Sequence, residues 1–266
     1  MTTPALAARD SVTMLRRNLV HMRRYPSLTV LVVGQPIVFL LLFVYVFGGT
    51  MGAGLPGGGG RQAYLAYITP AILMITVASV AAATAISVVT DMTGGIIARL
   101  RTMAVSRAAV LAGHVLGAML QSVMALAAVV AIALLLGLRS PAGPSEWLCA
   151  AGLLMLVAFA LTWLTVALGL ASPSVEAASN LPMPLVFLPF LGSGFVPVES
   201  MPAGLRWFAE HQPFTPIMDT LRSLLAGTPV DGGNAAAAVA WCVVIAAASY
   251  VWARRLFDRN RPGTAG

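Results

Sequence analysis

Six long intervals of this 266-residue chain contain no Arg, Lys, Asp or Glu, so all of its formal charge lies outside them. The intervals cover residues 25–60, 62–90, 108–138, 147–175, 177–198 and 232–253. Each holds an apolar run long enough to cross a hydrocarbon core of about 30 Å, which takes about 20 helical residues. A helix in water needs a polar face, and these runs have almost none. The sequence therefore predicts an all-α integral membrane protein with six transmembrane helices.

Composition agrees with a membrane location and excludes several kinds of chemistry. Hydrophobic residues make up 59% of the chain and charged residues 9%, whereas soluble domains have roughly 45–50% and about 25%. All 16 basic residues are Arg, so the chain has no Lys with which a P-loop could bind nucleotide phosphates. The arginines flank the apolar intervals, which predicts contact with membrane lipid and no binding of nucleic acid.

The arginines are distributed unequally between the two sides of the membrane. Five precede the first interval, three lie between the second and third, and four follow the last, while the loops of the other side hold four. Cytoplasmic loops carry the excess of Arg. Both termini are therefore expected in the cytoplasm, and the chain in a bacterial cytoplasmic (inner) membrane as a multi-pass protein.

Three further segments accompany the spans. Residues 1–27 combine an apolar stripe with several arginines, the pattern of an amphipathic helix that lies in the cytoplasmic headgroup layer. The six-span domain is expected at 28–254 and a cytoplasmic tail at 255–266. Within the domain, residues 197–233 are expected to form an external, re-entrant segment before the last span, with short helices at 204–211 and 215–225.

The fifth interval differs from the others because Pro182, Pro184 and Pro189 all fall within one span. A broken helix is tolerated in a bilayer only where protein or a cavity covers the freed backbone groups. We therefore expect the second and fifth spans to line an export path at a dimer interface, with 197–233 as its outer gate. Truncating Phe214 or Met218 in this gate is expected to alter transport with little effect on folding. The residues assigned to the path and gate are Asn180, Pro182, Pro184, Pro189, Ser193, Pro197, Pro202, Pro213, Phe214, Pro216, Met218 and Arg222.

The spans offer little catalytic chemistry. None of the nine acidic residues lies well inside an interval, which argues against an intramembrane enzyme or a proton-coupled pump. His114 in the third interval is expected to be a hydrogen-bonded packing residue, and Cys149 and Cys242 small apolar ones. Ser193 lies between two glycines, as some nucleophilic serines do. However, it belongs to the outer leaflet and His114 to the inner one, too far apart for the contact of about 3 Å that a nucleophile and its base require.

One polar segment on the cytoplasmic side, residues 91–107, carries an apolar stripe at helical spacing. The pattern alone leaves two interpretations open. The segment is either a loop helix that only anchors the topology, or a short transverse helix that offers a docking surface to a cytoplasmic subunit. The residues assigned to this coupling segment are Asp91, Gly94, Gly95, Ile96, Ile97, Arg99, Leu100, Arg101, Met103 and Arg107.

The coupling segment, continued through Gly113, resembles the cytoplasmic loop of ABC-2 type export permeases, in particular the daunorubicin/doxorubicin resistance membrane subunits. Residues 195–202 (Phe-Val-Pro-Val-Glu-Ser-Met-Pro) and 212–216 (Gln-Pro-Phe-Thr-Pro) resemble the external segment of the same family. With the six spans and the N-terminal helix, the resemblance covers nearly the whole chain. Ala98 and Ala104 depart from the family, which often has an acid and a proline there, and both leave the apolar stripe intact.

The resemblance implies a permease subunit of an ATP-driven exporter that has no ATPase site of its own. It would pair with a second permease copy, identical or related, and with two separate cytoplasmic ATP-binding cassette subunits that bind ATP and Mg. The implied cargo is an amphipathic drug-like or lipid-like compound, as in multidrug efflux and antibiotic resistance. Two alternatives are a permease for lipid-linked polysaccharide and a non-transport membrane assembly protein. No catalytic residue, metal site or cofactor is expected on this chain.

Overall fold

The computed structural model describes residues 26–55, 59–93 and 107–259. These residues form helices joined by short loops, and they contain no β-strand. In chain order the elements are α2 (Pro26–Leu42), the π-helical turn η1 (Phe43–Phe47), α3 (Gly48–Ala53), α4 (Gly60–Thr93), α6 (Arg107–Leu135), α7 (Pro144–Ala171), α8 (Val175–Asn180), α9 (Met183–Phe187), η2 (Leu188–Leu191), η3 (Val198–Ser200), α10 (Ala203–His211), α11 (Phe214–Ala226) and α12 (Gly232–Arg259).

Five helical stretches in the described residues are long and apolar enough to cross a membrane. They are Val32–Ala53, Gly60–Thr93, Leu111–Leu135, Pro144–Ala171 and Gly232–Phe257. They coincide with the first four and the last of the six intervals predicted from the sequence. A run of apolar residues this long favours a helix because only a helix satisfies all of its backbone hydrogen bonds inside one segment.

The fifth predicted span is not one continuous helix. Its apolar stretch, Val175–Leu191, is divided into α8, α9 and η2. Pro182 lies at the break between α8 and α9, and Pro189 lies in η2. Proline lacks the N–H donor of an interior helical position. Helices α2 and α4 each accommodate a single proline, Pro36 and Pro70, whereas three fall close together here. This concentration of prolines accounts for the division, so five of the described helical stretches are long enough to span where the sequence predicted six.

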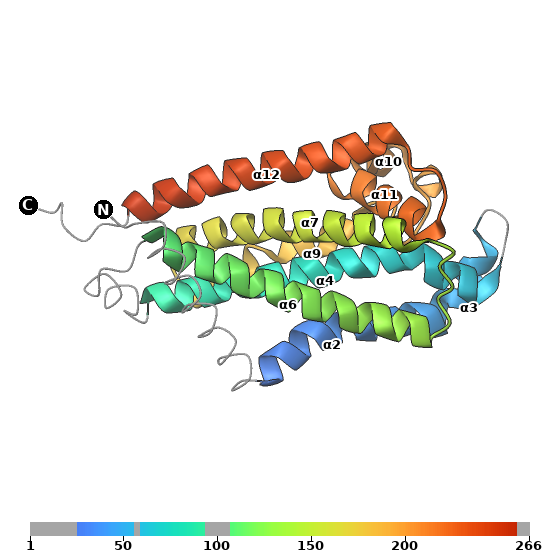
Figure 1. Ribbon diagram of the computed structural model, residues 1–266, viewed down its shortest axis with the longest axis horizontal. Helices are drawn as coiled ribbons and strands as arrows, with labels where there is room; N and C mark the ends of the chain where they lie inside the picture. Colours follow the sequence, from blue (N-terminus) through green and yellow to red (C-terminus); the bar gives the residue numbers. More distant parts are fainter. Residues whose placement is uncertain (1–25, 56–58, 94–106, 260–266) are drawn as a thin grey trace, which may run out of the picture.

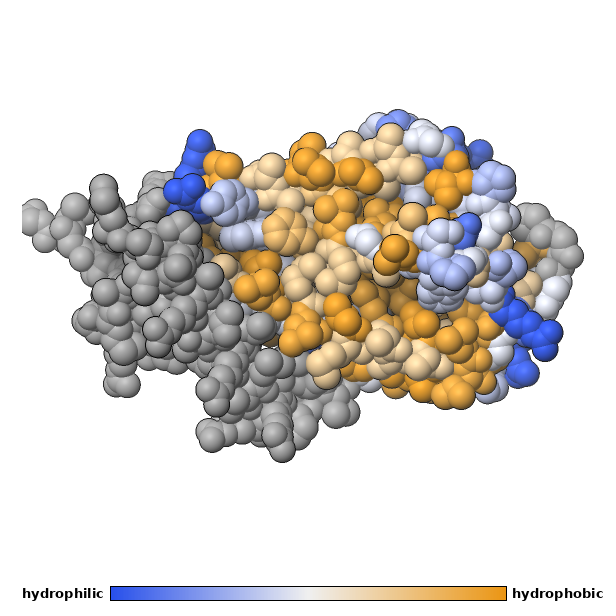
Figure 2. Space-filling model, in the orientation of Figure 1, coloured by the Kyte–Doolittle hydropathy of each residue, from blue (hydrophilic) through white to orange (hydrophobic). Residues whose placement is uncertain are grey.

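The long helices lie side by side, and different segments of the chain lie at the two ends of the bundle (Figure 1). The end of α4, the start of α6 and the end of α12 lie at one end, α2 begins part-way along the bundle and runs toward the other end, and α3, α10 and α11 lie at that other end. Apolar side chains cover the middle of the face shown in Figure 2, and hydrophilic ones gather toward the ends. This banding is the pattern of a protein surrounded by lipid.

The central helix of the bundle is α4. In the most apolar 18-residue stretch of α4, 78% of the residues are buried; the corresponding share is 22% in Val32–Ala53 and 17% in Gly232–Phe257. Helix α4 packs against α2, α3, α6, α7, α8, α9 and α11, and every residue from 68 to 81 is buried. Small residues make this close packing feasible in lipid; a Cβ on Gly169 of α7 would lie 2.7 Å from the carbonyl oxygen of Ala85.

The burial of α4 bears on one expectation from the sequence. We expected the second span to line an export path at a dimer interface together with the fifth. Over residues 68–81, however, the protomer's own helices already cover α4. A second subunit has no access to that stretch unless the bundle opens, whereas α9 leaves Met183 and Phe187 more than half exposed.

Candidate outer gate and coupling region

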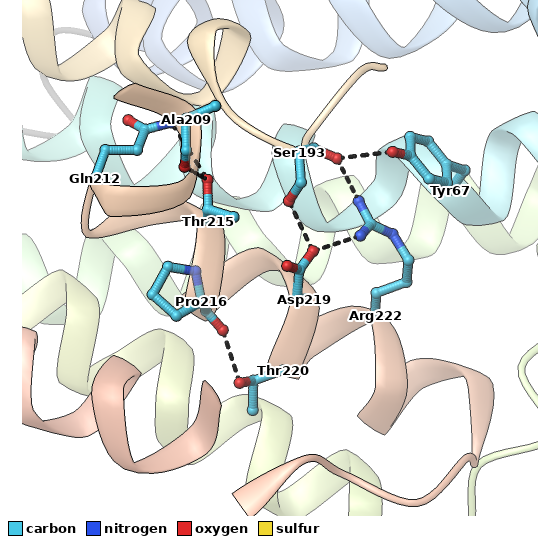
Figure 3. Close-up of polar contacts among 9 residues, drawn as sticks. All are labelled: Tyr67, Ser193, Ala209, Gln212, Thr215, Pro216, Asp219, Thr220 and Arg222. Carbon is cyan, nitrogen blue, oxygen red and sulfur yellow. Dashed lines mark hydrogen bonds and ion pairs between the residues drawn. The ribbon is translucent and has the colours of Figure 1, made fainter. Parts of the chain in front are cut away.

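Four polar residues from three separate parts of the chain meet at the end of the bundle that holds α10 and α11, the end predicted to face outward, and we call them the outer polar cluster: Tyr67, Ser193, Asp219 and Arg222 (Figure 3). The Ser193 hydroxyl donates to Asp219 Oδ1 at 2.7 Å. Arg222 Nη1 donates to the same carboxylate oxygen at 2.7 Å, and its Nη2 donates to the Ser193 carbonyl at 2.7 Å. The Tyr67 hydroxyl donates to that carbonyl at 3.0 Å.

The cluster joins the external segment to the central helix. Asp219 and Arg222 lie one turn apart on α11, Ser193 follows η2, and Tyr67 lies on α4. The Arg222 guanidinium also lies over the Tyr67 ring, 4.1 Å from its centroid, a favourable cation–π contact. Since the Asp219–Arg222 pair is partly exposed, with 24% of the Arg222 side chain and 32% of the Asp219 side chain accessible, water weakens its attraction. The cluster therefore contributes more to the relative placement of α4, α11 and the turn at Ser193 than to the free energy of folding.

The two glycines beside Ser193 allow the chain to approach α4 and α11 closely. A Cβ on Gly194 would lie 2.7 Å from Ala71 Cβ, 2.7 Å from the Pro189 carbonyl oxygen and 2.9 Å from Met218 Sδ. A Cβ on Gly192 would lie 2.3 Å from Gln212 Nε2. Around Gly194 two of these atoms are rigid, so a side chain does not fit there, whereas the atoms near Gly192 are ends of side chains.

Ser193 links the turn after η2 to α11. Its hydroxyl donates to the same Asp219 carboxylate oxygen that accepts from Arg222. Among the described residues, no group of three or more His, Cys, Asp or Glu side chains could hold a metal ion.

The two helices of the external segment have different surroundings. Helix α11 packs against α4, α7 and α12, and Phe214, Met218 and Leu221 on it are 3%, 0% and 0% exposed. Helix α10 is more peripheral, with Trp207 64% exposed. Both short helices predicted from the sequence are present, within a residue or two of the expected bounds.

This placement bears directly on two residues assigned to the outer gate. Phe214 and Met218 belong to the main hydrophobic core, so each is a packing residue in this conformation. Their role in a gate stays a prediction. The expectation that they could be truncated with little effect on folding conflicts with their burial, because deleting buried side chains leaves cavities.

The prolines assigned to the path and gate are distributed along the whole stretch and are not gathered at one point. Most of them lie where a short helix begins, positions where the missing N–H costs nothing. Pro182, Pro202 and Pro213 immediately precede α9, α10 and α11. The others lie within or beside these turns: Pro184 in α9, Pro189 in η2, Pro197 before η3 and Pro216 in α11. Asn180, at the end of α8, is exposed and is not part of the outer polar cluster.

An aromatic cluster holds the broken fifth segment against the first span. The rings of Phe190 and Phe195 stack with centroids 4.4 Å apart, and Phe43 lies 4.6 Å from Phe195. Phe39 meets Phe190 edge-on at 5.9 Å. Such ring pairs stabilise the packing by more than the burial of their apolar area alone. Here they hold the turn that contains Ser193 against the first span.

At the opposite end, only the edges of the predicted coupling segment are described. Gly94, Gly95, Ile96, Ile97, Arg99, Leu100, Arg101 and Met103 lie outside the described residues, so the docking surface stays a prediction. Asp91 lies in the last turn of α4, and Arg107 is the first residue of α6.

Asp91 is buried and lies against a residue of α6. It is 6% exposed, and its Oδ2 lies 3.3 Å from Nε2 of His114, which is 7% exposed. The assignment of Asp91 to a surface that docks a cytoplasmic subunit stays a prediction. His114, expected to be a hydrogen-bonded packing residue, is buried with this carboxylate beside it.

Three of the contacts described above were not anticipated from the sequence. Asp219 and Arg222 are spaced by three residues, which on a helix brings two side chains together, so their pairing could have been found. Tyr67 lies in an uncharged apolar interval with no local signal of a polar role. The approach of His114 to Asp91 depends on the packing of α4 against α6.

Together, the long apolar helices around a buried α4 define a multi-pass helical membrane protein. The sequence model of the ABC-2 type transporter family matches residues 10–226, and the chain belongs to that family. It is 30% identical over 225 residues to the daunorubicin resistance ABC transporter permease protein DrrB1 of Streptomyces coeruleorubidus, covering 84% of this chain and 77% of that protein. The chain is thus a membrane-embedded permease of the ABC-2 class, which works with an ATP-binding subunit.

Proposed function

We propose that this chain is the permease subunit of an ATP-driven exporter that moves an amphipathic, drug-like or lipid-like compound out of the cytoplasm or the inner leaflet. The observation that carries this proposal is the match across most of the chain to a permease named for daunorubicin resistance. The chemistry of the chain supports it. The sequence contains no Lys for a P-loop, so energy must come from a partner that binds ATP and Mg.

The working complex is proposed to contain two permease copies and two ATP-binding subunits. The permeases are expected to be identical, with a related second permease as the other arrangement. The exposed face of the fifth segment supports this pairing, because Leu181, Met183 and Phe187 are 48%, 52% and 54% exposed on the isolated protomer. A path between two such faces would be lined by flexible apolar side chains, which suit varied amphipathic ligands.

The chain is proposed to cross the membrane six times, with the broken segment α8–α9–η2 as the fifth crossing. An even number of crossings is supported because α2 runs away from the end of the bundle at which α12 finishes (Figure 1). Arg254 and Arg255 are exposed at that end, which the positive-inside rule assigns to the cytoplasm. The domain bounds proposed are 1–27 for the N-terminal helix, 28–254 for the spans and 255–266 for the tail.

The external segment is proposed to act as the outer gate in a particular way. Helix α11 is inserted between α4, α7 and α12, so it behaves as a re-entrant element that closes the outer end of the bundle. The outer polar cluster would then hold the closed position, because it links α11 to α4 through contacts that are partly exposed to water. Opening would require these contacts to break and the apolar face of α11 to shift.

Affinity purification in a mild detergent tests the assembly most simply. The tagged chain, expressed with its neighbouring genes, should retain a separate subunit that contains a P-loop, and native mass spectrometry should give two copies of each. If the chain is recovered without any ATP-binding protein under conditions that keep it folded, the exporter proposal fails. That outcome would favour a non-transport membrane protein.

A further inference from the structure

Two titratable side chains are buried together where α4 and α6 approach each other at the inner end of the bundle. Asp91 Oδ2 and His114 Nε2 are 3.3 Å apart. Asp91 lies two residues before α4 ends at Thr93, and His114 lies seven residues after α6 begins at Arg107. We call these two residues the α4–α6 pair.

A hydrophobic cluster lies close to the pair along both helices. Val88 is three residues from Asp91, and Leu111 and Val115 are within three residues of His114; all three are buried in one cluster with Trp163 of α7 and Phe257 of α12. Burying a carboxylate and an imidazole in such a place is unfavourable unless they interact, and two apolar side chains could pack α4 against α6 at lower cost. Groups of this kind within membrane domains commonly have a role beyond packing.

The position of the pair indicates what that role is. Residues 94–106, which connect α4 to α6, contain most of the predicted coupling segment. A contact between Asp91 and His114 joins the two helices just inside that connection. Any force applied to the connection then acts on α4 and α6 together and cannot simply separate them.

The central helix extends from this pair to the outer polar cluster. Asp91 and Tyr67 are 24 residues apart on the continuous helix α4, which corresponds to roughly 36 Å at 1.5 Å per residue. Because α4 is buried along most of this length, its movement must be shared with the helices around it. A firm attachment at the inner end is therefore required if movement there is to reach the outer end.

We propose that Asp91 and His114 are positioning residues that clamp α4 to α6 and so couple ATP hydrolysis by the partner subunit to transport. The proposal rests on the exporter function above. The contact persists through the transport cycle, and it acts through its charge and hydrogen bonding. Neither residue touches the cargo or the nucleotide.

Exchanging the two residues tests the pair. In purified complexes reconstituted into vesicles, with daunorubicin as the probe, Asp91→His and His114→Asp should each lower transport per ATP hydrolysed by about tenfold, the size of a typical coupling between sites. The double variant, which restores an Asp–His contact in reverse, should recover most of this loss. Thr84→Val is the matched control. It changes a buried polar residue of α4 that bonds only its own helix, and it should transport normally.

A cross-linking experiment separates coupling from folding. Asp91→Cys and His114→Cys are combined in a chain whose two native cysteines are replaced, and a short, reducible thiol cross-linker joins the new pair. Cross-linking should raise transport per ATP, and reduction should reverse the gain in the same folded molecules. The proposal is overturned if cross-linking stops transport, if the exchanged pair performs no better than the single variants, or if the single variants couple normally. If the unaltered complex shows no ATP-driven transport at all, the exporter function fails and this inference fails with it.

Discussion

Replacing Gly194 with alanine should destabilise the protein, although it adds only one methyl group. The added Cβ would lie 2.7 Å from both Ala71 Cβ and the Pro189 carbonyl oxygen, well inside normal contact distance. Neither atom can rotate away, because one is fixed to the buried helix α4 and the other belongs to the backbone. Overpacking of this kind costs about 1–3 kcal/mol. A loss of about 2 kcal/mol would raise the ratio of unfolded to folded protein about thirtyfold.

Two other glycines calibrate this prediction. A Cβ on Gly192 meets mainly the ends of side chains, those of Gln212, Met218 and Thr215, which can move. Gly192→Ala should therefore cost less than Gly194→Ala. A Cβ on Gly204 in α10 has nothing within 4 Å, so Gly204→Ala should be neutral or slightly stabilising, since alanine is the better helix former.

The assay is unfolding of the detergent-solubilised chain in SDS or heat, followed by tryptophan fluorescence. The predicted order of stability is Gly204→Ala, then Gly192→Ala, then Gly194→Ala. Adding Ala71→Gly to Gly194→Ala removes one of the two rigid obstacles and should recover part of the loss. If Gly194→Ala unfolds at the same midpoint as Gly204→Ala, the close packing of this turn against α4 is wrong.

Three further outcomes are expected. Met218→Ala should cost about 2–5 kcal/mol, as buried large-to-small substitutions do, and unchanged stability would contradict its burial in the core. Replacing both Ile97 and Leu100 with Asp should remove the apolar stripe, and should therefore abolish co-purification with the ATP-binding subunit while the chain stays inserted. Normal retention of that subunit would refute the docking surface. Cysteines placed at positions 60 and 101 in a cysteine-free chain should be labelled only from outside and only from inside, respectively, and the reverse pattern would refute the topology.

The spanning helices could be predicted from the sequence because their signal is local. An apolar run without charge needs no tertiary information, and four of the first five intervals and the last one behaved as expected. The two external helices were also predictable, since Pro202 and Pro213 mark where α10 and α11 begin. The interruption of the fifth span was visible in its prolines, but its division into α8, α9 and η2 was not.

The contacts that make up the candidate sites could not be predicted because they depend on how helices pack. Tyr67 becomes part of a polar cluster only because Ser193 and Arg222 reach α4 from distant parts of the chain. The sequence places Asp91 in the predicted docking segment, and its contact with His114 exists only because α6 packs beside α4. Likewise, the burial of Phe214 and Met218 depends on the packing of α11 against α4, α7 and α12.

The most direct test of this account is ATP-driven movement of a probe across a membrane that contains the purified components. Vesicles are prepared with the chain alone, with the ATP-binding subunit alone, and with both, and daunorubicin transport is followed after addition of ATP and Mg. Transport should occur only with both components and should stop when ATP is replaced by a non-hydrolysable analogue. Transport or ATP hydrolysis by the chain alone would contradict the central claim that this permease draws its energy from a separate subunit.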